Sequence, residues 1–305
     1  MKYTKQPLSI QQQIEKLKFR GLIIDDENIA ANYLLNISYY RLRAYTYPFQ
    51  DNYNEDEDHH FIKDDIHFSD IIDLYYFDCK LRMLIFNAIE KIEVAIRTKI
   101  VYEYALESEN SHWFLSETLY RKNFDKIIKD VKMEINRSNE DFIKHYDSKY
   151  GEPNFPPAWM TLEVLSFGTL SRMFSYLDKR YESNKKITRL FGLPNSAILD
   201  NWIHSISVLR NCCAHHSRIW NRRFPIGIKL SYNTSYPFID RGTIKTIRSN
   251  KLFASLCCIK YILDIVSPDN DFKNNLIKTI NKGGRLLKVK DMGFPENWCS
   301  LDVWK

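Results

Sequence analysis

Glycine and proline are scarce in this chain, with 9 and 10 copies among 305 residues. Together they reach about half of the roughly 12% that proteins use on average. An all-β sandwich or a glycine-rich nucleotide fold needs far more turn-forming residues than this. Hydrophobic residues make up 44% of the chain, which excludes wholesale disorder. The scarcity of turn formers therefore predicts long helices.

Metal-binding cysteine motifs and long hydrophobic runs are also absent. The chain has six cysteines, four of them in the adjacent pairs Cys212-Cys213 and Cys257-Cys258, and none has the CxxC spacing of a zinc site. Lys260 and Asp264 interrupt the most apolar late stretch, so we expect no membrane span. The first residues lack the apolar core of a signal peptide. We predict a cytoplasmic protein without a metal or a cofactor.

Caps and apolar spacing predict where helices begin and end. Ser9 and Gln12 form a capping box for a first helix, and Asp25-Asp26 open a second. The stretch from Ser69 to Ser108 contains no glycine or proline, and as one helix it would span roughly 57 Å. On that helix, Glu93 and Arg97 have the i, i+4 spacing of a surface ion pair.

These elements indicate an all-α fold in two domains. Residues 1–60 are expected to form a small N-terminal helical unit that ends in an acidic loop at 51–60. Residues 61–305 are expected to form a larger helical domain with a basic C-terminal region. Residues 225–242 are the one place for a short hairpin or an irregular excursion.

Positive charge is concentrated near the C-terminal end of the sequence. Residues 205–305 contain 17 Lys and Arg against 7 Asp and Glu, whereas residues 1–204 contain 27 against 31. This asymmetry favours a polyanionic partner, and a nucleic acid before a membrane, although a solvated basic surface is an equal alternative. Four cations at three- to four-residue spacing predict a helical face that follows a phosphate backbone: Arg241, Lys245, Arg248 and Lys251.

Residues 195–224 have the clearest amphipathic pattern. A helical wheel places the apolar residues Trp202, Ile206, Leu209, Cys213 and Trp220 on one face. Nearly opposite lies a polar row: Asp200, His204, Ser207, Asn211, His215, Arg218 and Arg222. His216 falls on the apolar face, which predicts a buried structural histidine. If the helix ends near His216, Arg218 and Arg222 leave the polar row.

This polar row differs from an ordinary solvated helix face because it contains no Lys or Glu. An imidazole transfers protons near neutral pH, and guanidinium groups match phosphate geometry. Such a set can cleave a phosphodiester without metal, by deprotonating a 2′-hydroxyl, protonating the leaving oxygen and stabilising the phosphorane. His215 is the candidate for proton transfer, and Arg210 for phosphate binding with help from Arg218 or Arg222.

The segment LRNCCAHHSRIWNR at 209–222 resembles the signature of the Abi-like (abortive infection) family of the HEPN superfamily. Three further blocks are similar to that family in the right order: YYRLRAYTYPF at 39–49, EKIEVAIRT at 90–98, and the run from Trp159 through SFGTLSRMF. The resemblance covers roughly residues 10–265. The HEPN motif, an Arg, a polar residue, three further residues and a His, carries over onto Arg210, Asn211 and His215.

The resemblance implies an all-helical HEPN bundle and a toxin of phage defence that cleaves or binds RNA without metal. It also implies a site composed of two facing motifs. The chain has one such motif, so we expect a homodimer. Some members of the family are restrained by a small non-coding RNA, which makes an antitoxin RNA a candidate partner beside the target RNA.

Two other functions remain open from the sequence. A catalytically silent HEPN module that binds RNA or nucleotide as a sensor or scaffold would retain the same residues. A DNA-binding regulator is the third alternative, because the N-terminal helices could form a helix-turn-helix. Asp25, Asp26 and Glu27 make that last alternative weak, since they place acid where a recognition helix needs basic residues.

Overall fold

The computed structural model describes residues 2, 6–53, 59–150 and 152–305. These residues form an all-α protein, which confirms the predicted fold class, and isolated β-bridges occur among them in place of strands. The segment from residue 225 to Asp240 is irregular, as expected. Part of the expected acidic loop, residues 54–58, lies outside the described residues.

The chain divides into two compact units. Unit 1 comprises Met1–Arg82 and Asn275–Lys288, and unit 2 comprises Met83–Asn274 and Val289–Lys305. This division falls within a helix and not after residue 60, where the sequence predicts a boundary. A short segment late in the chain also belongs to the first unit.

Unit 1 contains three short helices, α1 (Ile10–Phe19), α2 (Glu27–Ile37) and α3 (Tyr39–Thr46). The predicted capping box is confirmed at α1, where the Gln12 amide donates to Ser9 Oγ at 3.2 Å and the Ser9 amide donates to Gln12 Oε1 at 2.8 Å. Asp26 caps α2 by accepting from the amides of residues 28 and 29. The predicted starts of both helices are therefore confirmed.

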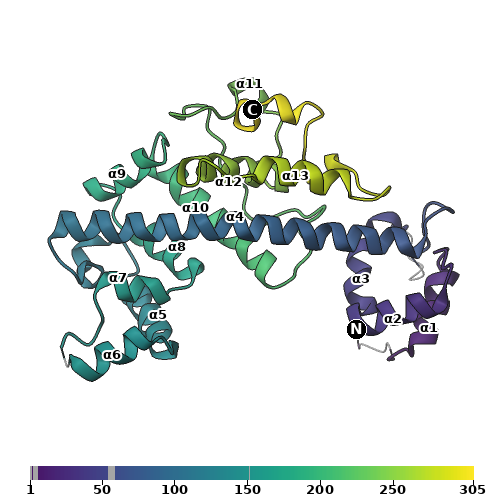
Figure 1. Ribbon diagram of the computed structural model, residues 1–305, viewed down its shortest axis with the longest axis horizontal. Helices are drawn as coiled ribbons and strands as arrows, with labels where there is room; N and C mark the ends of the chain where they lie inside the picture. The colour runs from purple at the N-terminus through teal and green to yellow at the C-terminus, as the bar shows by residue number, and fades with distance from the viewer. Residues whose placement is uncertain (1, 3–5, 54–58, 151) are drawn as a thin grey trace. The chain divides into compact units, whose positions relative to one another are not determined.

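Helix α4 (Phe68–Ser108) is a single unbroken helix of 41 residues (Figure 1). It supplies Phe68–Arg82 to unit 1 and Met83–Ser108 to unit 2. The prediction from the missing glycine and proline is confirmed almost to the residue. Within unit 2, isoleucines at helical spacing bury one face of α4: Ile85, Ile89, Ile92, Ile96 and Ile100. No helix among the described residues combines the length and the apolar composition that crossing a bilayer requires.

The remaining α-helices are α5 (Phe124–Arg137), α6 (Asp141–Lys149), α7 (Ala158–Thr161), α8 (Phe167–Tyr176), α9 (Glu182–Leu190), α10 (Ser196–Ala214), α11 (Arg241–Ile244), α12 (Leu252–Val266) and α13 (Phe272–Asn281). Seven 3₁₀ turns join them in the described chain: Tyr47–Phe49, Trp113–Leu115, Glu117–Leu119, Leu162–Val164, Val289–Met292, Trp298–Ser300 and Asp302–Trp304. Helix α10 packs against α8, α9 and α12, so it lies at the centre of unit 2.

The last 3₁₀ turns complete the core of unit 2. Trp304 is fully buried, stacks against Phe253 and Phe272, and meets Trp298 edge-on. Its indole Nε1 donates to Cys257 Sγ at 3.2 Å. This sulfur lies inside the apolar helix α12, where burial raises the pKa of the Cys257 thiol above its usual range.

Candidate active site at the end of helix α10

Helix α10 ends in a Schellman motif. The amide of His216 donates to Cys213 O at 3.1 Å, and the amide of Ser217 donates to Cys212 O at 2.9 Å. Between them, His216 adopts a left-handed conformation with φ of 54°. These bonds satisfy the last carbonyls of the helix, so the chain turns away from the helix axis directly after His215.

This ending changes the predicted polar row. Arg210 and Asn211 lie on α10, and His215 is its C-cap residue, exposed to solvent. Arg218 and Arg222 leave the row because the helix stops at Ala214. Within the row, Ser207 is buried and donates to the carbonyl of His204 at 2.8 Å.

The apolar face of the wheel is confirmed for Trp202, Ile206, Leu209 and Cys213, which are all buried. Trp220 is also buried but lies beyond the helix. The prediction for His216 is wrong. This residue is exposed, because the wheel extended a helical rotation past the point where the helix ends.

The Arg210 side chain is anchored from helix α4. Its Nε lies 3.6 Å from Glu93 Oε2, and its guanidinium carbon lies 5.5 Å from the centre of the Phe86 ring. The side chain keeps 30% of its surface exposed. Arg210 is therefore held against α4 while part of its guanidinium remains accessible to an anion.

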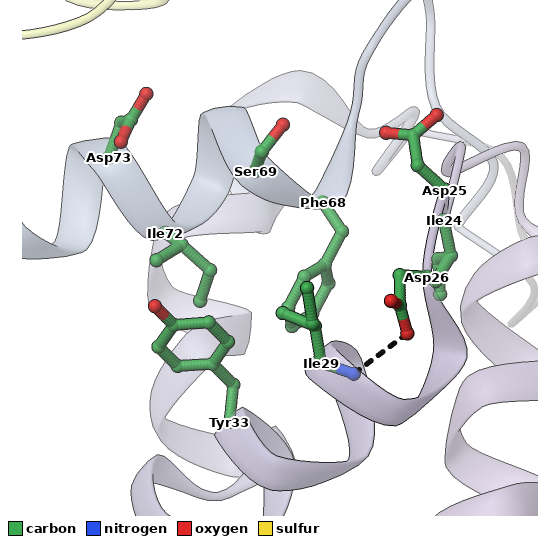
Figure 2. A pocket seen from close by; sticks show the side chains of 9 residues that line it. All are labelled: Ile24, Asp25, Asp26, Ile29, Tyr33, Phe68, Ser69, Ile72 and Asp73. Atoms are coloured by element: carbon green, nitrogen blue, oxygen red, sulfur yellow. Dashed lines mark hydrogen bonds between the residues drawn. The ribbon is translucent and has the colours of Figure 1, made fainter.

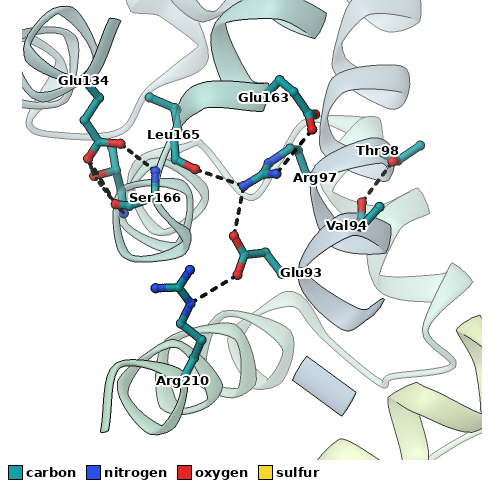
Figure 3. A network of polar contacts seen from close by, with 10 residues as sticks. Glu93, Val94, Arg97, Thr98, Glu134, Glu163, Leu165, Ser166 and Arg210 are labelled. Carbon is teal, nitrogen blue, oxygen red and sulfur yellow. Dashed lines mark hydrogen bonds and ion pairs between the residues drawn. The ribbon is translucent and has the colours of Figure 1, made fainter. Parts of the chain in front are cut away.

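Glu93 connects Arg210 to a second arginine. Figure 3 shows the Glu93 carboxylate between the guanidinium groups of Arg97 and Arg210. Arg97 Nη2 donates to Glu93 Oε1 at 3.0 Å and to the Leu165 carbonyl at 2.9 Å, and Arg97 Nη1 lies 3.7 Å from Glu163. The predicted pair of Glu93 and Arg97 is confirmed, but it is largely buried instead of lying at the surface, since the two side chains keep 13% and 11% of their surface exposed. The extension to Arg210 and Leu165 has no signal in the sequence.

The charge on Glu93 is costly in this position. Burial raises the pKa of the Glu93 carboxyl, and it outweighs the opposing effect of Arg97 and Arg210. A carboxylate kept at such a cost is weak evidence for stability. It is better explained as a group that orients the two arginines.

The predicted basic helical face does not form. Helix α11 contains only Arg241–Ile244, and the chain beyond it turns before α12 begins. Lys245 and Arg248 are exposed, and Arg241 lies over the Tyr232 ring at 5.4 Å. Lys251 is buried, with 6% of its surface exposed, and in this position it cannot contact a phosphate.

A pocket of about 240 Å³ lies in unit 1 (Figure 2). Its polar lining includes three carboxylates, of which Asp25 is paired with His67 at 2.8 Å and Asp26 caps α2. The lining residues are Ile24, Asp25, Asp26, Ile29, Tyr33, Phe68, Ser69, Ile72 and Asp73. Acidic groups repel phosphate, so this pocket does not suit an RNA backbone. Among the described residues, no three His, Cys, Asp or Glu side chains form a group that would hold a metal ion.

The fold and the site together define an all-α protein with an Arg-Asn-x3-His motif at the end of its central helix. The family model of the Abi-like proteins matches residues 32–221, well over half of the chain, and this chain belongs to that family. The match includes the motif and the Glu93–Arg97 pair. Family membership points to a role in abortive infection. No curated protein and no solved structure matches the chain.

Proposed function

We propose that this protein is a HEPN-type endoribonuclease toxin that acts in abortive infection or in a toxin-antitoxin system. It cleaves RNA without a metal, and a small non-coding RNA restrains it. The observation that supports this proposal best is that the end of helix α10 presents one anchored motif residue and two exposed ones. Arg210 is anchored by Glu93, while Asn211 and His215 are exposed to solvent.

The motif residues divide the chemistry among them. His215 removes the proton of a ribose 2′-hydroxyl, whose oxygen then attacks the adjacent phosphorus. Arg210 stabilises the negative charge that builds on the phosphorane, and Asn211 orients a phosphate oxygen by donating a hydrogen bond. The 5′-oxygen leaves with a proton from an acid. The products are a 2′,3′-cyclic phosphate and a 5′-hydroxyl end.

Acid and base are best supplied by two copies of the motif. One exposed His215 per chain serves one of the two roles, and a second copy of the chain serves the other. We therefore propose a homodimer in which the ends of the two α10 helices face each other. Light scattering with and without RNA tests this arrangement, and a monomer under both conditions would refute it.

The nuclease is tested by RNA cleavage in EDTA, with protein purified free of nucleic acid. Wild type should leave 2′,3′-cyclic phosphate ends, and His215→Ala should lower the rate by about 10²- to 10⁴-fold. Equal cleavage by both proteins would exclude this site.

The alternative is a silent module that binds RNA without cutting it. One observation favours it, namely that the ion pair with Glu93 engages part of the Arg210 guanidinium in this structure. Two results together would support that module over the nuclease. The wild-type protein would bind RNA tightly, and it would cleave no RNA even when RNA from an infecting phage is added.

A further inference from the structure

Two segments come together directly after the candidate active site. The amide of Phe224 donates to Asn250 O at 2.9 Å, and that of Ile228 donates to Ser249 O at 3.0 Å. At Gly227 the approach is so close that a Cβ atom would lie 2.7 Å from Ser249 Oγ. The segment that follows His215 is thereby fixed against the turn that precedes α12.

Lys251 joins these two segments to a third. Its Nζ donates to Asn221 Oδ1 at 3.0 Å and to the Asp291 carbonyl at 2.7 Å. Gly293 packs on the same side chain, since a Cβ atom there would lie 2.7 Å from Lys251 Cβ. A buried ammonium with two acceptors on different segments acts as a structural link between them.

The charges of three arginines act on this link. Burial, together with the positive charges of Arg223, Arg248 and Arg218, holds the pKa of Lys251 below its usual value, although Asp291 opposes them. Arg223 and Arg248 are exposed. The amide of Lys251 also donates to the Arg248 carbonyl at 3.0 Å, which fixes the turn that bears this arginine. The result is an excess of positive charge a few residues beyond His215.

We propose that Arg223 and Arg248, flanked by Arg218, form a patch that binds the phosphate backbone of single-stranded RNA, and that Lys251 positions this patch without contacting the RNA. These three arginines form the arginine patch. It replaces the helical face expected from the sequence and adds Arg223, which the periodic pattern did not include. The inference rests on the proposed function, because it assigns to the RNA a second contact surface beside the motif.

RNA is the polyanion that fits the patch best. Exposed guanidinium groups on an open surface bind phosphate without reading bases. Arg218 and Arg223 follow His215 by three and eight residues in the chain, and the turn that bears Arg248 is paired with the segment of Arg223, so one strand can contact both the motif and the patch. A strand that leaves the motif at Arg210 and His215 would have its next phosphates held by arginine.

The test is the salt dependence of RNA binding by the full-length chain. Anisotropy of a labelled 20-nucleotide oligouridine is measured in EDTA at several KCl concentrations, with His215→Ala as the common background so that cleavage is slow on the time scale of the measurement. Arg223→Gln and Arg248→Gln should each weaken binding about 3- to 10-fold at moderate salt. Each should also reduce the slope of log K against log[salt] by about 0.7, the value for one lost phosphate contact on a single strand.

Lys144→Gln is the matched control, because Lys144 is an exposed cation on α6. Loss of the same affinity and slope in this control would refute a local patch, as would an unchanged slope in both arginine variants. Binding of wild type to vesicles of anionic phospholipid but not to the oligouridine would also overturn the inference.

Lys251→Gln separates positioning from contact. It should lower the melting temperature and weaken RNA binding, whereas Arg223→Gln and Arg248→Gln should leave the melting temperature unchanged. The double variant Lys251→Gln with Arg223→Gln should lose less affinity than the product of the fold-losses of the two single variants, because both substitutions act on one surface. An unchanged melting temperature with a full loss of one phosphate contact would mean that Lys251 touches RNA.

Failure of this inference and failure of the nuclease are distinguishable. Cleavage by wild type in EDTA that survives both arginine substitutions, with unchanged RNA affinity, removes the patch and keeps the nuclease. Salt-dependent binding through Arg223 and Arg248 without any cleavage keeps the patch and removes the nuclease.

Discussion

Glu93 Oε2 lies 3.6 Å from Arg210 Nε, and the other oxygen of the same carboxylate accepts a hydrogen bond from Arg97 at 3.0 Å. The longer distance is that of an ion pair without a direct hydrogen bond. Glu93 is thus the point at which the long helix α4 meets the motif on α10. Its charge orients Arg210, and the arginine side chain keeps 30% of its surface exposed, so part of the guanidinium stays open to a phosphate.

Neutralising Glu93 should impair catalysis more than RNA binding. In Glu93→Gln the guanidinium of Arg210 loses the charge that orients it, and cleavage should fall about 10- to 100-fold because reacting groups must be placed accurately. Glu15→Gln is the control, since Glu15 is an exposed carboxylate on α1. Initial cleavage rates and anisotropy measure the two effects, and equal losses in both variants would refute a specific role for Glu93.

The stability of the Glu93 region should fall as the pH rises. Burial raises the pKa of Glu93 above its usual 4.5, so between 4.5 and the raised value the folded chain binds more protons than the unfolded chain. Wild type should therefore lose stability relative to Glu93→Gln as the pH rises through this range, and the two should converge below it. Urea denaturation at pH 4 to 8 measures the difference in free energy of unfolding between the two proteins. The titration of other groups cancels in this difference because both proteins share those groups. A gap that widens on acidification would contradict this sign.

The two neighbouring histidines should behave in opposite ways. His216 is the left-handed residue of the Schellman motif, a position that glycine fills without strain. His216→Gly should therefore retain cleavage and raise the free energy of unfolding by about 0.5–1 kcal/mol. His215→Ala should lower the cleavage rate by about 10²- to 10⁴-fold and leave stability nearly unchanged. Thermal melts and cleavage assays on the pair measure both effects, and a loss of cleavage in His216→Gly would move the catalytic role to that residue.

Lys179 should make the protein more stable in mild alkali. Its Nζ donates to the Phe174 carbonyl at 2.7 Å and lies 4.0 Å from the centre of the Phe174 ring. Burial lowers the pKa of Lys179 from 10.5 to about 8, although Asp200 opposes the shift. Between pH 8 and 10.5 the Lys179 side chain is protonated in the unfolded chain and neutral in the folded one, so the contribution of Lys179 to stability rises with pH.

Lys179→Met should remove this pH dependence and stabilise the protein at pH 7 by about 1–3 kcal/mol. Lys185→Met is the control, because Lys185 is an exposed lysine on α9. Denaturant midpoints at pH 7 and 10 measure the effect. A destabilised Lys179→Met at pH 7 would show that the hydrogen bond to Phe174 outweighs the cost of burying the charge.

Local signals in the sequence predicted the elements well. The absence of glycine and proline from Ser69 to Ser108 is sufficient to predict helix α4. The capping box of Ser9 and Gln12 is sufficient to predict where helix α1 begins. Both depend on neighbours in the chain, which the sequence displays directly. The same is true of the i, i+4 pair of Glu93 and Arg97.

Predictions failed where the chain turns or where distant segments meet. Helix α10 ends because His216 adopts a left-handed backbone conformation. Histidine has no strong preference for that conformation, so the sequence does not mark the end, and the helical wheel extends the helix too far. Lys251 matched a helical spacing but is buried by contacts with Asn221 and Asp291. The contact between Glu93 and Arg210 joins helices far apart in the sequence, and no periodic pattern encodes such a contact.

The packing of Trp304 has a consequence for the order of events during synthesis. Unit 2 gains this side chain, its stacking on Phe253 and the carbonyl that Lys251 needs at Asp291 only when residues 291–304 have left the ribosome. Until then α10 is already made, but the core around α12 is unfinished and the arginine patch lacks its link. The proposed ribonuclease, assembled in this order, would complete its active surface only after residues 291–304 had been synthesised.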